Sequence, residues 1–283
     1  ETEDFTIGLL TPEGKTFAIP LDLGATWFPG LDYGPALGMV AGGYDEGDIA
    51  FTNDPYSGGQ HLPDILTFKP VFFESRRIAI AGVLVHHLDV GGGAAGSYDA
   101  SATEIYQEGF RIPPLKIDEG GRRNQAVIEL LLANSREPAN VGGDFASQLA
   151  ALDIGVAGLQ RIAQRYGADA LRTYEMFMGP LDQVKPWQTS GCEGVARFLA
   201  RVWRLFIDQH SGEVKPFGEP RPEVTRALHL AIKETTEGIE ALKFNTPVSK
   251  MMEFVNASGA TLPPRAEAEA FLLILSPYAP HLA

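Results

Sequence analysis

Alternating hydrophobic and polar positions predict strands in the first part of the chain. Residues 5–20 hold two alternating runs separated by a Thr-Pro-Glu-Gly turn sequence, so we expect a hairpin there. Residues 65–73 and 78–85 are apolar runs with β-branched side chains, and the charged residues between them predict a second antiparallel hairpin. Residues 48–52 are a further short strand that leads into a turn rich in proline and glycine.

Helical spacing dominates the rest of the chain. Residues 126–133 and 145–165 predict two helices, the second with an apolar face that repeats every three to four positions. After residue 166 the strand signals end, and residues 195–206 form an amphipathic pattern with Arg197, Arg201 and Arg204 on other faces. Three further helices are expected at residues 223–242, 248–257 and 266–275.

Composition divides the chain at the same place. Of the 31 glycines, 23 lie in residues 1–165, and glycine favours turns and weakens helices. Residues 166–283 carry 12 basic and 14 acidic residues, which leaves 11 basic and 22 acidic of the chain's 23 and 36 for the first part. We therefore expect an α+β fold: a mixed domain of strand hairpins and helices over residues 1–165, then an all-α helical bundle over residues 166–283.

Charge and cysteine content exclude several classes of protein. The strongly acidic first part lacks the clustered lysine and arginine that nucleic-acid binding requires. No apolar run reaches the 18 residues of a membrane-spanning helix, and the acidic start of the sequence does not resemble a signal peptide. The single cysteine, Cys192, cannot form an internal disulfide. These features are typical of a cytoplasmic protein without a membrane partner.

Histidines and aspartates gather in residues 53–89. His61 and Asp64 stand three apart in a turn that contains a proline, and His86 follows a predicted strand. If the hairpin pairs as expected, both groups meet at one end of it, where imidazole and carboxylate suit Zn²⁺, Mn²⁺ or Fe²⁺. Asp54 and Asp89 are further candidates, whereas strand alternation points His87 away from His86. A set of hydrogen-bonded His-Asp pairs without metal explains the spacing about equally well.

Two other groups carry weaker signals. The glycine-rich run 91–97 is typical of a backbone nest for an anion, but no Lys-Ser or Lys-Thr follows it, so it is not a P-loop. Close backbone packing or a hinge explains the run at least as well. Glu104 and Glu108, four apart on a short predicted helix, are candidate acid/base groups, although a solvated helix face is the more ordinary interpretation.

Residues 45–150 resemble the hydantoinase B/oxoprolinase family, which also supplies a subunit of acetone and acetophenone carboxylases. With weaker similarity at its edges, the resemblance runs from about residue 1 to residue 165. It rests on ordered motifs, namely Asn53-Asp54-Pro55-Tyr56-Ser57-Gly58-Gly59, His61-Leu62-Pro63-Asp64, His86-His87-Leu88-Asp89-Val90-Gly91-Gly92, Glu108-Gly109-Phe110-Arg111-Ile112-Pro113-Pro114, Asn134-Ser135-Arg136-Glu137-Pro138 and Gly143-Asp144.

This resemblance implies a divalent metal (Zn, Mn or Fe) bound by His61, Asp64 and His86, with Asp89 as a fourth ligand. Asp54 and Asp89 are the implied catalytic candidates. It also implies a hydantoinase A-like partner subunit that uses ATP to activate the carbonyl of a cyclic amide or ketone, so that the pair hydrolyses or carboxylates it. The sequence itself contains no ATP-binding motif, in agreement with ATP being bound by a partner.

Residues 166–283 resemble a different family, the leucyl-tRNA synthetases, in the part that enters the anticodon-binding bundle. The motifs are Tyr166-Gly167-Ala168-Asp169-Ala170-Leu171-Arg172, Tyr174-Glu175-Met176-Phe177-Met178-Gly179-Pro180, Glu193-Gly194-Val195-Ala196-Arg197-Phe198-Leu199 and Ser276-Pro277-Tyr278-Ala279-Pro280-His281-Leu282-Ala283. The synthetase's nucleotide-binding motifs are absent, so the resemblance implies weak tRNA contact without aminoacylation.

Both resemblances cover less than a family member, so we expect two truncated parts joined near Tyr166, inside a helix that runs from one to the other. A natural fusion, an engineered chimera and an error of sequence assembly are all compatible with such a join. Three functions remain open: a metal-dependent hydantoinase or carboxylase subunit fragment, a non-catalytic tRNA-binding module, and a folded chimera without activity.

Overall fold

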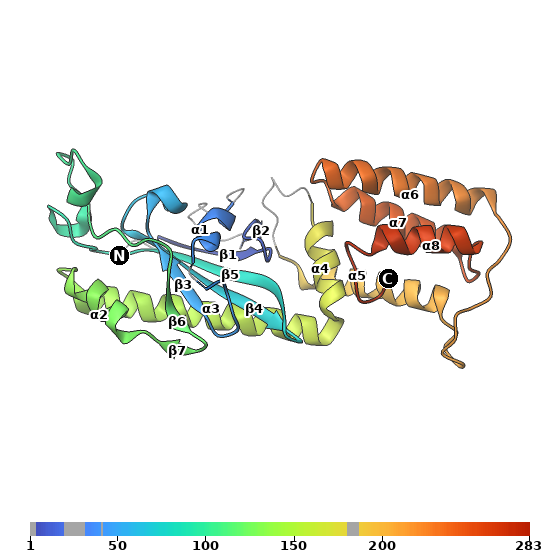
Figure 1. Ribbon diagram of the computed structural model, residues 1–283, viewed down its shortest axis with the longest axis horizontal. Helices are drawn as coiled ribbons and strands as arrows, with labels where there is room; N and C mark the ends of the chain where they lie inside the picture. Colours follow the sequence, from blue (N-terminus) through green and yellow to red (C-terminus); the bar gives the residue numbers. More distant parts are fainter. Residues whose placement is uncertain (1–3, 20–31, 41, 180–186) are drawn as a thin grey trace. The chain divides into compact units, whose positions relative to one another are not determined.

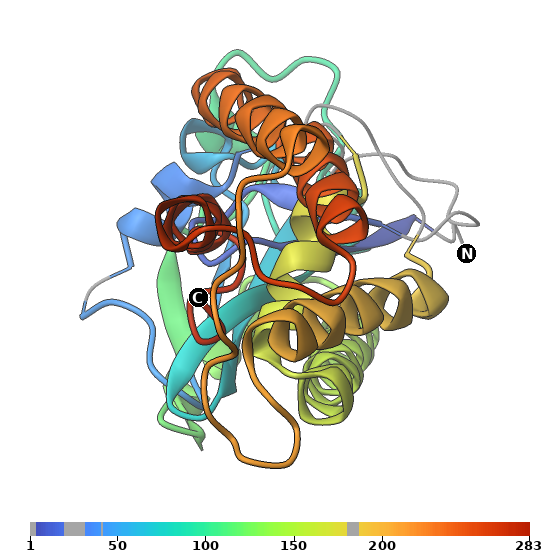
Figure 2. The ribbon, with the colours of Figure 1, turned by 90° about the vertical axis from the view of Figure 1, so that its right-hand side faces the viewer.

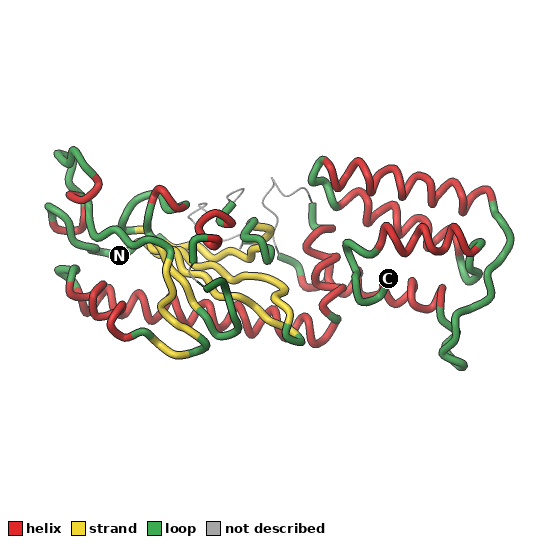
Figure 3. Tube along the Cα trace, viewed as in Figure 1, coloured by secondary structure: helices red, strands yellow, loops and turns green. Residues whose placement is uncertain are grey.

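The computed structural model describes residues 4–19, 32–40, 42–179 and 187–283. The chain divides into two compact units, Glu1–Arg161 and Ile162–Ala283. Within the described residues, the β-strands belong to the first unit and the second is built of helices (Figure 3). This confirms the expected α+β class with a helical second part.

The first unit is built on a seven-stranded antiparallel sheet with the order β2-β1-β5-β4-β3-β6-β7 (Figure 1). Both predicted hairpins are found in it, and so is the predicted short strand. The strands are β1 (Phe5–Leu10), β2 (Thr16–Ala18), β3 (Ile49–Thr52), β4 (Asp64–Phe73), β5 (Arg76–His86), β6 (Leu115–Glu119) and β7 (Arg122–Arg123).

The long β4–β5 hairpin is the centre of this sheet. Its two-residue turn, Glu74 and Ser75, has φ values of 50° and 64°, which is the left-handed geometry that follows the twist of paired strands. From the turn the ladder runs back to a final pair, Asp64 opposite His86. The sheet therefore brings two of the predicted metal ligands to one end.

Different elements pack against the two faces of the sheet. Leu66, Phe68, Ile80 and Leu84 pack in one cluster with Tyr33, together with Leu37 of the short helix α1 (Gly34–Gly38). The opposite face lies against the helix α3 (Pro138–Tyr166), where Phe145 meets Phe51 with ring centroids 5.9 Å apart. Because successive side chains of a strand point to opposite faces, Asp64 and His86 share the face of Leu66 and Leu84.

Helix α3 is longer than its apolar pattern predicts, and it ends where the join was expected. It follows α2 (Gln125–Ala133) and begins at Pro138, because proline suits the first turn of a helix. It ends at Tyr166, since Gly167 has a φ of 87° before α4 (Ala168–Phe177) begins. The expectation of one helix running through the join is therefore wrong: a left-handed glycine separates two helices.

The second unit packs its helices around one apolar core. The four predicted helices are all present, as α5 (Thr189–Phe206), α6 (Pro222–Glu240), α7 (Asn245–Ser258) and α8 (Arg265–Leu275), coloured gold to red in Figure 2. Phe254 and Phe271 stack in the core with centroids 4.4 Å apart. In the described chain, no helix combines the length and apolar composition that crossing a membrane requires.

Candidate metal centre

The predicted ligands meet at the end of the β4–β5 hairpin. Asp64 is the first residue of β4, and its backbone N–H donates to the carbonyl of His61 at 3.0 Å, which closes the turn through Pro63. His86 is the last residue of β5 and pairs with Asp64 across the ladder. A tight turn and a strand register therefore set the relative positions of the three side chains.

The three side chains form one cluster. His86 Nδ1 lies 3.1 Å from Asp64 Oδ1, and His61 Nδ1 contacts Asp64 Oδ2. The two imidazole rings stand 4.9 Å apart, and one possible ligand atom from each residue lies within 4.8 Å of the others. The Asp64 side chain is 2% exposed, whereas those of His61 and His86 are 45% and 27% exposed. The cluster thus has a buried carboxylate below and two accessible imidazoles above.

The electrostatics of the cluster favour ionised Asp64. Burial raises the pKa of its carboxyl, but the hydrogen bonds and charges of the two histidines outweigh burial and leave the pKa below its ordinary value. The hydrogen bond with Asp64 raises the pKa of His61 against the opposing effect of burial. A carboxylate held ionised between two imidazoles is ready to ligate a cation.

The cluster fits a divalent transition metal by its donor set. Two imidazoles and one carboxylate are the ligands found in sites for Zn²⁺, Mn²⁺ and Fe²⁺. The buried Asp64 carboxylate faces one imidazole with each oxygen, so the three side chains direct donor atoms toward one region. Open sides at His61 and His86 leave room for further ligands.

Asp4 is a neighbour that sequence reasoning missed. The β1–β5 ladder pairs Phe5 with Val85, and the N–H of His86 donates to the Asp4 carbonyl at 3.0 Å. The register therefore puts Asp4, His86 and Asp64 in one row across three strands, with side chains on the same face. The negative charge of Asp4 also raises the pKa of His61. A pairing of β1 with β5, far apart in sequence, was the missing information.

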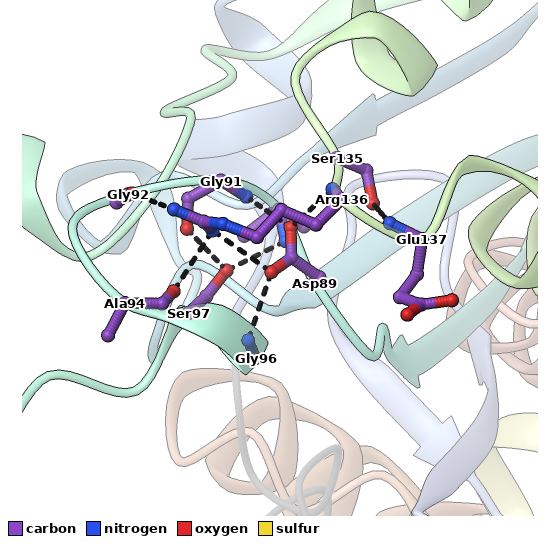
Figure 4. Close-up of polar contacts among 10 residues, drawn as sticks. Asp89, Gly91, Gly92, Ala94, Gly96, Ser97, Ser135, Arg136 and Glu137 are labelled. Atoms are coloured by element: carbon purple, nitrogen blue, oxygen red, sulfur yellow. Dashed lines mark hydrogen bonds and ion pairs between the residues drawn. The ribbon is translucent and has the colours of Figure 1, made fainter.

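Asp89 is not brought to the cluster. Its carboxylate accepts N–H bonds from Gly91, Gly96 and Arg136 at 2.9–3.0 Å and faces the Arg136 guanidinium at 3.1 Å (Figure 4). Burial raises its pKa, but these donors outweigh burial and leave it below the ordinary value. All of its oxygen lone pairs therefore point to internal partners rather than to His86.

The glycine run after Asp89 wraps that carboxylate rather than an external anion. Gly91 and Gly92 have φ values near 90°, and a Cβ on Gly92 would lie 2.5 Å from the Gln107 carbonyl. The carbonyls of Gly92 and Ala94 accept hydrogen bonds from Arg136 at 2.6 and 3.0 Å. The interpretation as an anion nest for a ligand is therefore replaced by close backbone packing around an internal ion pair.

Asp54 is likewise engaged by its own surroundings. It caps the 3₁₀ turn η1 (Pro55–Ser57) by accepting the N–H of Tyr56 at 3.0 Å, and it pairs with Arg111 Nη2 at 3.0 Å. Its side chain is 3% exposed. The structure thus places the catalytic candidate Asp54 beside Arg111 and outside the metal cluster.

His87 points away from His86, as strand alternation predicts. It is fully buried, its N–H donates to the Pro63 carbonyl at 2.8 Å, and its Nε2 lies 3.2 Å from Gln148 Oε1. Burial lowers the pKa of His87. Gln148 in turn donates to the carbonyls of Ile65 and Val83 at 2.7 and 2.9 Å. Together they fasten α3 to the ligand-bearing end of the hairpin.

Glu104 and Glu108 do not form a paired acid/base site. They flank the single 3₁₀ turn η3 (Ile105–Gln107), in which Glu104 caps the turn, and neither belongs to the cluster. The more ordinary interpretation, a solvated turn, describes what is seen.

A cavity of about 290 Å³ lies on the α3 face of the sheet, opposite to the face of the Asp64 and His86 side chains. Asp4 and His86 line its end, and Val83 and Val85 line its apolar wall. Asp144 and Ser147 of α3 supply polar atoms opposite this wall. A small, partly apolar molecule would fit here with a polar group toward the strand ends.

Comparison with known proteins gives different relatives for the two parts. The family model described as hydantoinase B/oxoprolinase matches residues 1–178. The ATP-dependent caprolactamase from Pseudomonas jessenii is similar in structure, with a TM-score of 0.54 and 25% identity, over 76% of this chain and 37% of that one.

Leucine–tRNA ligases are among the similar curated proteins. That of Pelodictyon phaeoclathratiforme is 42% identical over 171 residues, which are 56% of this chain and 21% of that protein. Leucine–tRNA ligase 1 of Rhizobium johnstonii is 50% identical over 125 residues, or 43% of this chain and 15% of that protein. The chain therefore spans about a fifth or less of these two relatives, and it combines two kinds of ancestry.

Proposed function

Because the chain belongs to the hydantoinase B/oxoprolinase family through residues 1–178, we propose that it is a metal-dependent subunit fragment of an ATP-driven lactam hydrolase or related carboxylase. The observation that carries this is the convergence of His61, Asp64 and His86 within 4.8 Å. The structural similarity to an ATP-dependent caprolactamase supports the same class. Hydantoins, oxoproline and other lactams share a ring carbonyl, the group on which such a site acts.

In this proposal each residue of the cluster has a stated task. His61, Asp64 and His86 would hold the metal, and Asp4, the residue before β1, would supply a second carboxylate. A bound divalent metal polarises a carbonyl or lowers the pKa of a water molecule. Asp64, buried and ionised, orients both imidazoles through its two oxygens.

ATP is used by a partner subunit in this proposal. The sequence carries no P-loop, and its glycine run is occupied by the Asp89–Arg136 pair. We therefore assign activation of the carbonyl to a hydantoinase A-like ATPase and the later step to this chain. Asp89 and Arg136 hold the loop 91–97 in shape, and Asp54 holds Arg111.

The test is metal analysis of the full chain purified without chelator. We expect about one divalent metal per chain, lost in His61→Ala and His86→Ala and kept in His229→Ala, whose histidine lies in the second unit. Metal content below about a tenth per chain after incubation with Zn²⁺, Mn²⁺ or Fe²⁺ contradicts the proposal. Equal metal content in all three variants contradicts it as well.

A second candidate function rests on the similarity to leucine–tRNA ligases. In a tRNA-binding module, Arg197 and Arg201 would contact the RNA backbone, and binding would weaken steeply with salt. However, Arg197 faces Glu193 at 3.6 Å and Arg201 donates to Asn256 at 2.8 Å, so both have internal partners. Charge reversal at the two arginines should abolish tRNA binding at low salt. If the unchanged chain binds no tRNA at low salt, the chain is a folded chimera without this function.

A further inference from the structure

A second and larger cavity, about 660 Å³, lies among the loops of the first unit. One wall is the backbone of Val90, Gly91 and Gly92, and another is the turn between α2 and α3, which carries Arg136. The remaining lining residues are Tyr106, Gly109, Phe110, Arg111, Ala133, Asn134 and Ser135. Two arginine side chains thus face one cavity of a size that suits a small molecule.

This cavity adjoins the turn that carries His61. The Asn53 side chain donates to the carbonyls of Leu62 and Phe110 at 2.7 and 2.9 Å, and its oxygen accepts the N–H of Ile112 at 2.7 Å. Gly109 packs so closely that a Cβ there would lie 3.5 Å from Leu62 Cβ and 2.8 Å from Val90. The cavity wall and the metal-bearing turn are therefore joined through buried Asn53.

Arg111 is held in place, but not all of its N–H donors have partners. Its Nη2 donates to Asp54 at 3.0 Å, and its guanidinium carbon lies 5.1 Å from the ring centre of Tyr56. Tyr106, whose hydroxyl interacts with the same guanidinium, stands at the rim of the cavity. A guanidinium has five N–H donors, so several of those of Arg111 are left to bind a ligand.

Arg136, like Arg111, is held in place by hydrogen bonds to neighbouring residues. Buried Asp89 and the carbonyls of Gly92 and Ala94 accept hydrogen bonds from its two Nη atoms (Figure 4). Its Nε–H has no hydrogen-bond partner among the described residues. Each arginine is therefore oriented by a buried carboxylate, and each keeps N–H donors that these hydrogen bonds do not use.

We propose that this cavity is a binding site for the oxyanion group, phosphoryl or carboxylate, of a small molecule. Planar guanidinium groups bind such oxyanions through paired N–H bonds, and groups fixed beforehand lose little entropy on binding. The apolar surfaces of Phe110 and Ala133 would contact the rest of the molecule. This site is separate from the metal centre, and its ligand binds whether or not metal is present.

The test is calorimetric titration of the metal-free full chain with inorganic phosphate, with acetate in a parallel titration and sodium chloride at matched ionic strength as the reference. Chelator is removed by dialysis beforehand, since it carries carboxylates itself. We expect saturable binding of at least one oxyanion, weakened at least about tenfold in Arg111→Met and in Arg111→Lys, which keeps the charge but loses the paired donors. Phosphate alone identifies a phosphoryl ligand, and acetate alone a carboxylate.

Controls separate this site from folding and from the metal centre. Arg122→Met, at an exposed position of β7, should bind as the unchanged chain does. The double variant Asp54→Asn/Arg111→Met removes both charges together, so no buried carboxylate is left without its partner. It should stay folded by circular dichroism and still lose oxyanion binding. His61→Ala should lose metal and keep the oxyanion. Arg136→Met should also weaken binding. The proposal is overturned if the unchanged chain shows no saturable binding, or if Arg111→Met and Arg136→Met bind as well as the unchanged chain.

Discussion

Asp64 and His86 face each other as the last pair of the β4–β5 ladder, and Asp64 Oδ1 lies 3.1 Å from His86 Nδ1. The register of one hairpin therefore fixes a histidine–carboxylate pair whose members lie 22 residues apart in the sequence. His61 joins them through the turn before β4. Strand pairing and this turn thus set the positions of the three candidate metal ligands.

Substitution of the central carboxylate tests this arrangement. Asp64→Asn keeps the shape of the side chain but removes the charge that orients both imidazoles. We expect metal affinity to fall by more than about tenfold, since even residues that only support ligands contribute about 10–100-fold. Competition with a chromogenic chelator measures the change. Affinity equal to that of the unchanged chain would mean that the metal lies elsewhere.

Asp4, the residue before β1, is expected to contribute to the same centre. Asp4→Asn leaves the backbone hydrogen bond to His86 intact and removes only the charge. Metal affinity should fall about tenfold while the thermal unfolding temperature of the metal-free chain stays within a few degrees. Asp32→Asn, an aspartate that instead accepts the N–H of Gly34, serves as the matched control. A similar loss of affinity in both variants would argue against a specific role for Asp4.

Gln148 should contribute strongly to the stability of the first unit. Its amide is 1% exposed and joins α3 to His87, Ile65 and Val83 through three hydrogen bonds. Gln148→Leu leaves two carbonyls and an imidazole without this partner, and we expect a loss of about 1–3 kcal/mol in the free energy of unfolding. Scanning calorimetry of the first unit's transition measures it. A change under about 0.5 kcal/mol would show that these groups find other partners.

Stability of the first unit should depend on pH through Asp89. Because its pKa is depressed in the folded chain, its contribution is present above the ordinary pKa of about 3.9 and is lost as pH falls through the folded value. Asp89→Asn should therefore cost about 1.5–3 kcal/mol at pH 7, as for hydrogen bonds to a charged group, and less near pH 3. Urea unfolding at both pH values gives the two differences. A pH-independent difference contradicts the assignment.

Cys192 should be unreactive until the second unit unfolds. It is fully buried in the helical core, and burial, aided by the charge of Glu175, raises the pKa of its thiol to about 12. The thiolate, which is the reactive form, is then scarce at pH 8. We expect less than about a tenth of a thiol per chain to react with a chromogenic disulfide in buffer, and one per chain in denaturant. Fast stoichiometric reaction in buffer would contradict the core shown here.

Much of the fold could be predicted from the local pattern of the sequence. Residues 65–85 form a hairpin because two apolar runs with β-branched side chains flank a short polar turn. Helix α5 forms because its buried side chains recur at three- and four-residue spacing. The short elements α1, β6 and β7 escaped prediction, because few residues carry too little periodicity and tertiary contacts stabilise them instead.

For the candidate site, the sequence determined which metal-binding side chains the chain contains. The tertiary structure decided which of these side chains lie together. The sequence supplied His61, Asp64 and His86, and a turn and one hairpin register were enough to bring them together. Asp89 stands three residues after His86, yet it binds Arg136, because loop packing gives its carboxylate nearer donors. Asp4 lies 82 residues from His86, and only the pairing of β1 with β5 makes them neighbours. Local spacing fixes side chains within a turn or hairpin, whereas pairing between distant strands depends on burial of the whole sheet.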